Sequence, residues 1–489
     1  MEPRKKTGFF LGPLLFIFAY FFPVFPQNPK AHTLFAVFLL VVIWWVTECI
    51  PIPITALLIP VLITAFKIAP VREAFAPFAN PIIMLFLGGF ILARAMCVHA
   101  LDQKLAFSIL SRKSIGLKKT RILFALGLIS LFLSMWISNT ATTAMMFPIA
   151  LGVLDALNSK KNEANSSSFG IAFLLTMAYA SSIGGIGTPI GSPPNLIAIG
   201  MLEKLADYRV TFFQWMIIGF SILIPMYFFL FFYMKFRCRI KPKDDSVAAL
   251  AIPDRKQHSG PLTRAQKNVL VAFSVTVFLW ILPGFVSLFW GRSAPLFLWL
   301  REHFPESAAA IIGAGLLFLL PINFSRGEFT LSLKEAMNID WGTLLLFGGG
   351  LSLGFQMFET GLADAIGKFF ISLGGDSANL ALITLLSVAL GVFLTEVTSN
   401  TASANMIVPI IIAVAKAASI SPLPPVLGSA MGCSFAFMLP VATPPNAIVY
   451  GSGMIPLQQM IRHGFWLNIA GIILIWLNMH FVAPLLGLL

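Results

Sequence analysis

Long apolar segments separated by short polar connections run along almost the whole chain. A helix needs about 20 apolar residues to cross the hydrocarbon core of a bilayer, so these segments predict membrane-spanning helices. The first segment follows Arg4-Lys5-Lys6 and also resembles a signal peptide, but it is rich in Phe and no small-residue cleavage site follows, which favours an uncleaved span. Eleven spans are expected, near residues 9–25, 33–50, 53–69, 82–98, 169–200, 212–236, 267–289, 307–321, 342–358, 425–453 and 465–487.

Two further apolar stretches, 121–157 and 380–417, carry a polar triplet at their middle: Ser138-Asn139-Thr140 in one and Ser399-Asn400-Thr401 in the other. Each stretch is long enough for two half-length helices. The simplest interpretation is a re-entrant hairpin with the triplet at its tip, because irregular backbone at membrane depth is tolerated only where it is buried in protein or lines a cavity. A continuous, kinked span is the alternative.

The two triplets belong to an internal repeat. Twelve residues that begin at Ser138 align with twelve that begin 261 positions later, at Ser399, and seven of the twelve are identical. Pro-Pro-Asn also recurs, at 193–195 and again 251 positions later at 444–446. Each copy holds five spans and one hairpin, and an odd number of spans makes the second copy enter the membrane from the opposite side. Inverted repeats of this kind are a symmetry on which many transporters are built.

The predicted organisation has a first span, two repeats and one charged, proline-containing linker. Its parts are the first transmembrane span 1–30; repeat 1 at 31–236, with scaffold spans 33–98, hairpin 121–157 and broken helix 169–200; the cytoplasmic linker 237–266; and repeat 2 at 267–489, with scaffold spans 267–358, hairpin 380–417 and broken helix 425–453.

Composition agrees with an all-α polytopic membrane protein, because 58% of the 489 residues are hydrophobic and only 11% are charged. The net charge of +13 does not indicate nucleic-acid binding. With the N-terminus inside, 23 Lys and Arg fall in predicted cytoplasmic segments and nine in outer ones, as the positive-inside rule expects. The four cysteines are scattered without CxxC spacing, so neither a disulfide framework nor a metal site is indicated.

The paired motifs suggest an ion-binding chemistry. Pro-Pro-Asn inside an apolar segment breaks a helix, since proline has no amide hydrogen and clashes with the preceding turn. The free amides at a helix start suit an anion, while carbonyl, hydroxyl and amide oxygens suit a hard cation such as sodium. No Lys or Arg lies within either triplet or either break. An anion held there would be balanced by helix dipoles, amide side chains and bound cations.

A structural interpretation of these polar residues remains open, because Ser, Thr and Asn in spans often bond across helices. The duplication at constant offset favours a ligand role. Glu48 and Glu396 lie in or beside apolar segments, where an ionisable group is a functional candidate by default. Glu396 is expected either to tune a cation site or to make structural hydrogen bonds, while Arg94 and His99 are expected to snorkel at a span's cytoplasmic end.

At these residues the chain resembles the divalent anion:sodium symporter family, the di- and tricarboxylate transporters that include the INDY-type proteins. The motifs that carry the resemblance are both triplets, the stretch 45–58, and the sequences Gly191-Ser-Pro-Pro-Asn195 and Ala442-Thr-Pro-Pro-Asn446. The resemblance implies a homodimer in which a transport domain, made of two hairpins and two broken helices, moves like an elevator against a scaffold domain.

The resemblance also implies the site residues. The first sodium site would use Ser134, Ser138, Asn139 and Gly191, and the second Thr395, Thr398, Asn400 and Ala442. The substrate carboxylates would meet Ser138, Asn139, Thr140, Ser192, Pro193, Ser399, Asn400, Thr401, Thr443 and Pro444. At the first break, where members often have Gly-Thr, this chain has Gly191-Ser192, which keeps the hydroxyl.

The resulting prediction is a sodium-coupled symporter of C4-dicarboxylates such as succinate, malate or fumarate, located in the cell membrane with its N-terminus in the cytoplasm. Sodium ions are the coupling ions and no prosthetic cofactor is expected. A sodium-independent dicarboxylate exchanger, and a transporter of citrate or another divalent anion, are the alternatives. A passive channel is a weaker one. The sequence contains no HExxH, P-loop or nucleophile-elbow motif that would favour an enzyme.

Overall fold

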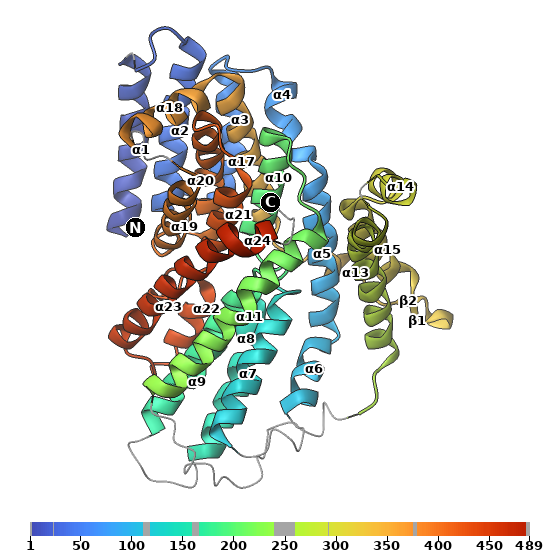
Figure 1. Ribbon diagram of the computed structural model, residues 1–489. Coiled ribbons are helices and arrows are strands. Elements are labelled where there is room, and N and C mark those ends of the chain that lie inside the picture. Colours follow the sequence, from blue (N-terminus) through green and yellow to red (C-terminus); the bar gives the residue numbers. More distant parts are fainter. Residues whose placement is uncertain are drawn as a thin grey trace.

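The computed structural model describes residues 2–22, 24–110, 118–158, 166–238, 260–291, 293–374 and 379–485. Within them the chain is almost entirely helical (Figure 1). Most of the predicted linker 237–266 lies outside the described residues. In the described residues, the one departure from an all-α fold is a small antiparallel hairpin of β1 (Pro321–Asn323) and β2 (Glu328–Phe329), which the sequence did not predict.

One group of helices stands at the upper left of Figure 1 and contains the N-terminus. Asparagine side chains cap two helices here. At the start of α2, Asn28 accepts a hydrogen bond from the Ala31 amide, and at the start of the helix that begins at Pro81, Asn80 accepts one from the Ile82 amide. Each asparagine thus supplies a partner that the first turn of its helix lacks. In this group α1 packs on α2 and α17 on α3. The helices are α1 (Pro3–Phe21), α2 (Pro29–Thr47), α3 (Ile52–Ala65), α4 (Val71–Phe75), η1 (Ala76–Ala79), α17 (Trp341–Glu359) and α18 (Leu362–Gly374).

A second group forms an arm at the right of Figure 1, where α15 packs against both α5 and α13. A Cβ built on Gly88 of α5 would lie 2.6 Å from the Ala310 backbone of α15, so only glycine allows these two helices to approach so closely. The elements of the arm and its surroundings are α5 (Pro81–Val98), α6 (Leu101–Leu110), α13 (Arg264–Trp290), α14 (Pro295–His303), α15 (Glu306–Leu319), η3 (Phe324–Arg326) and α16 (Leu333–Ala336).

The central group contains the duplicated motifs. The predicted interruption at each triplet is confirmed: α7 (Lys119–Ser134) and α19 (Leu380–Thr395) end just before the triplets, and α8 (Asn139–Asn158) and α20 (Asn400–Ala417) begin at the asparagine of each. Both bounds of α7 and α19, and the first residues of α8 and α20, repeat at the sequence offset of 261. The interruption agrees with two hairpins and contradicts a continuous kinked span. That each hairpin re-enters the membrane from one side stays a prediction.

The predicted breaks at Pro-Pro-Asn are also confirmed. The first lies between α9 (Ser166–Gly184) and α10 (Pro193–Ala206), and the second between α21 (Leu423–Gly432) and α22 (Pro444–Tyr450). In both, the second helix begins at the first proline, where the missing amide hydrogen has no intrahelical acceptor to lose. The remaining helices of this group are α11 (Phe212–Arg237), α23 (Leu457–Leu477), the π-helix η5 (Asn478–Val482) and α24 (Ala483–Leu485).

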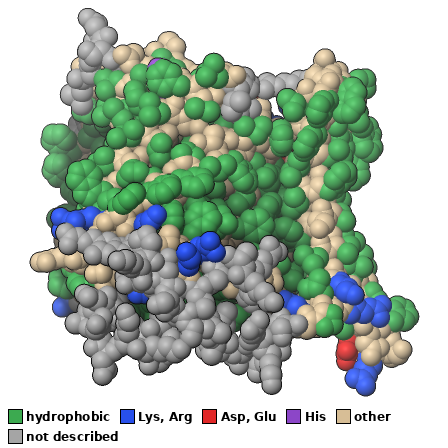
Figure 2. Space-filling model, turned by 60° about the horizontal axis from the view of Figure 1, so that its bottom comes forward, with side chains coloured by type: hydrophobic (Ala, Val, Ile, Leu, Met, Phe, Trp, Pro, Cys, Tyr) green, Lys and Arg blue, Asp and Glu red, His purple; other side chains and the backbone are tan. Residues whose placement is uncertain are grey.

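The surface has the character expected in a bilayer. Six helices of the described chain are long and apolar enough to cross a membrane, and four shorter helices are also apolar. Large apolar side chains are exposed on α1, α11 and α13, as Phe10, Phe236 and Phe289 show. Figure 2 shows hydrophobic side chains over the walls, with Lys and Arg gathered at the lower end of the molecule. The number of crossings and the orientation in the membrane stay predictions.

Candidate functional site

The two hairpin tips have the same local geometry. In the first, the Ser134 hydroxyl donates a hydrogen bond to Asn139 Oδ1 at 2.6 Å. In the second, the Thr395 hydroxyl donates to Asn400 Oδ1 at 2.5 Å. Both pairs join the last residue of the first arm to the first residue of the second arm. These four residues are among the eight that the resemblance implied for the two sodium sites, and each tip brings a hydroxyl and an amide oxygen together.

The two breaks also match each other. The Asn195 side-chain amide donates to the carbonyl oxygens of Gly185 and Thr188, both at 2.8 Å. At the same offsets in the second half, the Asn446 amide donates to Ala436 O at 2.9 Å and Leu439 O at 3.0 Å. Each asparagine thus holds its loop in a closed shape by satisfying two carbonyls that the broken helix leaves free. The third residue of Pro-Pro-Asn is a positioning residue.

Backbone oxygens converge at Gly191. A Cβ built on this residue would lie 2.7 Å from Gly185 O, 3.0 Å from Met135 O and 3.1 Å from Ser134 O. The hairpin tip and the break of the first half therefore face each other across a cradle of carbonyl oxygens that a side chain would fill. We call the space around Gly191 the carbonyl cradle. Carbonyl oxygens are ligands for a hard cation, so the cradle fits the predicted first sodium site.

The second half differs at the corresponding positions. Ala442, which takes the place of Gly191, is 5% exposed and carries a Cβ. The Thr395 hydroxyl here also lies 2.9 Å from Cys433 O. The Thr398 hydroxyl is buried and has no hydrogen-bond partner in the described part of the chain. An oxygen of this kind is available to a bound cation, so the second tip also fits a cation site.

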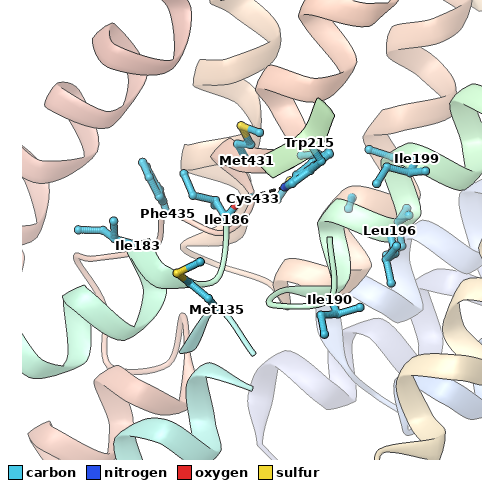
Figure 3. Close-up of a cluster of buried hydrophobic side chains, with 14 of the residues drawn as sticks. Met135, Ile183, Ile186, Ile190, Leu196, Ile199, Trp215, Met431, Cys433 and Phe435 are labelled. Atoms are coloured by element: carbon cyan, nitrogen blue, oxygen red, sulfur yellow. Dashed lines mark hydrogen bonds between the residues drawn. The ribbon is translucent and has the colours of Figure 1, made fainter. Parts of the chain in front are cut away.

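The two halves are interlocked in space. α22 of the second half packs against α8 and α9 of the first, and α10 of the first half packs against α20 and α21 of the second. The Ser192 and Ser434 hydroxyls, one from each half, share a hydrogen bond of 2.9 Å. Figure 3 shows Met135, Ile183 and Ile186 of the first half together with Met431, Cys433 and Phe435 of the second in one cluster of buried apolar side chains. The polar tips are therefore set in apolar packing.

The predicted substrate residues differ in their access to solvent. Ser138, Thr140 and Pro444 are exposed, and Asn139, Pro193, Ser399 and Asn400 are half-buried. Ser192, Thr401 and Thr443 are buried. Among the described residues no hydrogen bond joins the side chains of the two triplets, and each triplet lies at the hairpin tip of its own half.

Three residues add to the site that sequence analysis described. Glu396, which the analysis left open between two roles, is 4% exposed and accepts hydrogen bonds from the backbone amides of Phe437, Met438 and Leu439 and from the Asn468 side chain. These contacts assign it the structural role of joining the second hairpin tip to the second break.

The other two were missed. Arg4 of α1 donates to the carbonyl oxygen of Val46 and, at 2.6 Å, to that of Val397 in the second tip. Ser434 pairs with Ser192 but has Ile183 at its matched position in the first half, so the repeat gave no signal for it. No motif marks Arg4, whose contact spans most of the chain.

Solved structures with the same fold are membrane transporters. The YdaH transporter of Alcanivorax borkumensis aligns with a TM-score of 0.60 at 15% identity, over 86% of this chain and 89% of that one. MtrF of Neisseria gonorrhoeae, described as belonging to a class of antimetabolite efflux pumps, aligns with a TM-score of 0.57 at 14% identity, over 85% and 84%. These two similarities show the fold, and together with the apolar helices of the described chain they define an integral membrane protein.

Sequence relatives narrow the class. The family described as the sodium:sulfate symporter transmembrane region matches residues 13–489, and the chain belongs to this family. It is 36% identical to the sodium-dependent dicarboxylate transporter SdcS of Staphylococcus saprophyticus, over 99% of this chain and 92% of the relative. It is 35% identical to SdcS of Staphylococcus aureus, over 98% and 92%. The resemblance seen in the sequence motifs is thereby confirmed.

Proposed function

We propose that this protein is a symporter that carries C4-dicarboxylates such as succinate, malate and fumarate across the cell membrane together with sodium ions. The observation that carries the proposal is the matched pair of oxygen clusters at the hairpin tips, Ser134 with Asn139 and Thr395 with Asn400. The names of the two SdcS relatives support both the sodium dependence and the dicarboxylate substrate.

The cation sites follow from the chemistry of the tips. The first would use Ser134, Ser138, Asn139 and the backbone at Gly191, where the carbonyl cradle supplies three more oxygens. The second would use Thr395, Thr398, Asn400 and the backbone at Ala442. All these donors are neutral oxygens, which suit sodium. Within the described residues no three His, Cys, Asp or Glu side chains lie together as a transition-metal site would require.

The anion would bind between the tips and the starts of three helices. α8 and α20 begin at the triplet asparagines, so their first turns present backbone amides and a partial positive charge at this place. α10 begins with Pro193 and Pro194, which have no amide hydrogen, so it adds only the partial positive charge of its helix dipole. The exposed Ser138 and Thr140 give access from solvent. No Lys or Arg lies within either triplet or break, and the Arg4 guanidinium reaches the second tip only through the Val397 carbonyl. Bound sodium would supply further positive charge to compensate a buried dicarboxylate.

The larger assembly is also part of the proposal. The hairpins and broken helices would move together as a transport domain against a scaffold of α1–α5 and α13–α17, in a homodimer with a cytoplasmic N-terminus. Support comes from the interlocking of the four site-bearing parts, because α22 packs on α8 while α10 packs on α20.

Transport by purified protein in proteoliposomes tests the function. Uptake of labelled succinate should require an inward sodium gradient, and choline should not replace sodium. Asn139→Ala and Asn400→Ala should each reduce uptake by roughly 10- to 100-fold, because each variant loses a hydrogen-bonding amide worth about 1.5–3 kcal/mol to a charged ligand. Asn338→Ala, at an exposed asparagine far along the chain from both tips, is the control and should keep normal uptake. Near-normal uptake by either tip variant would disprove the proposed site.

A sodium-independent exchanger or a carrier of another divalent anion is the second candidate, and the sulfate in the family's description favours including sulfate in the test. Liposomes preloaded with succinate and assayed without sodium separate exchange from symport. Competition of labelled succinate uptake by citrate and by sulfate then ranks the substrates. Uptake in sodium-free vesicles that needs internal succinate would replace the symporter with the exchanger.

A further inference from the structure

A cavity of about 670 Å³ lies between α11 and the arm formed by α13, α14 and α15, away from the hairpin tips. Its apolar wall includes Phe213 and Ile217 of α11, Leu288 of α13 and Phe297 of α14. Volumes of this size are typical of sites that hold a ligand largely within apolar walls, with a few polar groups that fix its orientation. The cavity therefore has room for part of an amphipathic molecule.

Charge at this cavity is unbalanced. Arg209 pairs with Glu306 through a 2.9 Å contact between Nη2 and Oε2, so the charge of that carboxylate is already compensated. Arg301 also lines the cavity, is exposed, and forms no ion pair with any carboxylate in the part of the chain that the structure describes. Two arginines against one glutamate leave a net positive charge at the wall, which attracts an anionic group.

The surroundings place the cavity at the boundary between lipid tails and headgroups. α13 ends at Trp290, which is 69% exposed beside Leu288, and α14 carries Trp299 at 48% exposure. Exposed tryptophans are enriched at this boundary because the indole has an apolar body and a polar N–H. Figure 1 shows α14 near the upper ends of α13 and α15, at the opposite end from the basic face of Figure 2.

We propose that this cavity binds one phospholipid with an anionic headgroup. Its headgroup would lie beside Arg301 and the Arg209–Glu306 pair, and an acyl chain would lie along Phe213, Ile217 and Leu288. The apolar wall favours a lipid, because an acyl chain would cover it and a small soluble anion would not. The positive charge of Arg301 attracts a headgroup with net negative charge more strongly than a zwitterionic headgroup. This proposal does not depend on the transported substrate.

Native mass spectrometry of the detergent-purified protein tests the proposal. The protein is incubated with equal amounts of phosphatidylglycerol and phosphatidylcholine, and the lipids that remain bound are counted. We expect one phosphatidylglycerol to be retained in preference to phosphatidylcholine. Arg301→Gln should weaken its binding by about fivefold, the effect of one basic residue at an anionic lipid surface. Arg301→Lys, which keeps the charge, should retain most of the binding.

Arg326→Gln is the matched control, because Arg326 is an exposed arginine at the β1–β2 end of the same arm. It should leave lipid retention unchanged. Equal retention of the two lipids, or an equal loss in Arg326→Gln and Arg301→Gln, would overturn the proposal. Glycerol phosphate is added in a separate competition. If it displaced phosphatidylglycerol at equal concentration, the site would recognise a free anion and the assignment to a lipid would be wrong.

Discussion

Replacing Gly191 with alanine tests the carbonyl cradle directly. The new Cβ would lie 2.7 Å from Gly185 O and 3.0 Å from Met135 O, well inside the 3.4 Å at which ordinary contact begins. The methyl group would therefore occupy the space assigned to sodium and also strain the backbone. Strain of this kind costs about 1–3 kcal/mol. Gly191→Ala should therefore lose stability through strain in any salt, and it should also lose sodium binding at the cradle.

The two effects separate in a thermal unfolding assay run in sodium chloride and in choline chloride. A site that binds only the folded protein adds about 2.7 kcal/mol at a ligand concentration 100 times Kd. In a chain of this length that corresponds to an increase in Tm of about 3 °C, since 1 kcal/mol shifts Tm by about 2–4 °C at 150–250 residues and by proportionally less in longer chains. Gly191→Ala should lose the sodium-dependent increase that belongs to this site.

Gly367→Ala is the control for strain alone. Its Cβ would lie 2.6 Å from Ala413 O, a contact as short as the one at Gly191, but between α18 and the distal part of α20. It should lower Tm equally in both salts and keep the full response to sodium. If Gly191→Ala kept the same sodium-dependent increase in Tm as the unaltered protein, the cradle would not be a sodium site.

Three further outcomes are expected. Thr401→Val should lower succinate affinity several-fold in a binding assay with little loss of stability, because it removes a buried hydroxyl at nearly constant volume; unchanged affinity would remove Thr401 from the site. Glu396→Gln should lower Tm equally in sodium and in choline, by an amount equivalent to about 2–4 kcal/mol, because an amide cannot accept all four hydrogen bonds that the carboxylate accepts. A Tm within about 1 °C of the unaltered protein would contradict the role of Glu396 in joining the second tip to the second break. In a background without native cysteines, a cysteine at the exposed Glu328 should react with an impermeant reagent only from the cytoplasmic side and one at the exposed Glu302 only from outside; reaction of both from one side would exclude the proposed topology.

The sequence predicted the hairpins and breaks well because their signals are local and duplicated. A triplet of polar residues inside an apolar stretch and a double proline each interrupt a helix wherever they occur. The structure places the interruptions at those residues, so that α8 begins at Asn139 and α10 at Pro193. Matched motifs also implied matched geometry, and the Asn195 and Asn446 contacts agree with that inference.

The contacts that the sequence did not predict join residues far apart along the chain, or involve residues with no counterpart in the other repeat. Arg4 reaches Val397 across nearly the whole chain, and nothing near either residue indicates the other. Glu396 was noticed as a charge in an apolar segment, but its partners depend on how the second break folds. The hairpin of β1 and β2 and the interfacial α14 are too short to give a periodic signal.

The interlocking of the two halves has a consequence for biosynthesis. α8 completes its packing only when α22 arrives, although the ribosome makes α22 near the end of the chain. Until then, the second arm of the first hairpin lacks a helix that packs against it in the finished protein, and any polar group that it leaves facing lipid is costly. The first half must therefore wait in the membrane in an incomplete state. Truncations that end before Pro444 should leave this intermediate exposed to the quality-control proteases that remove unfinished membrane proteins.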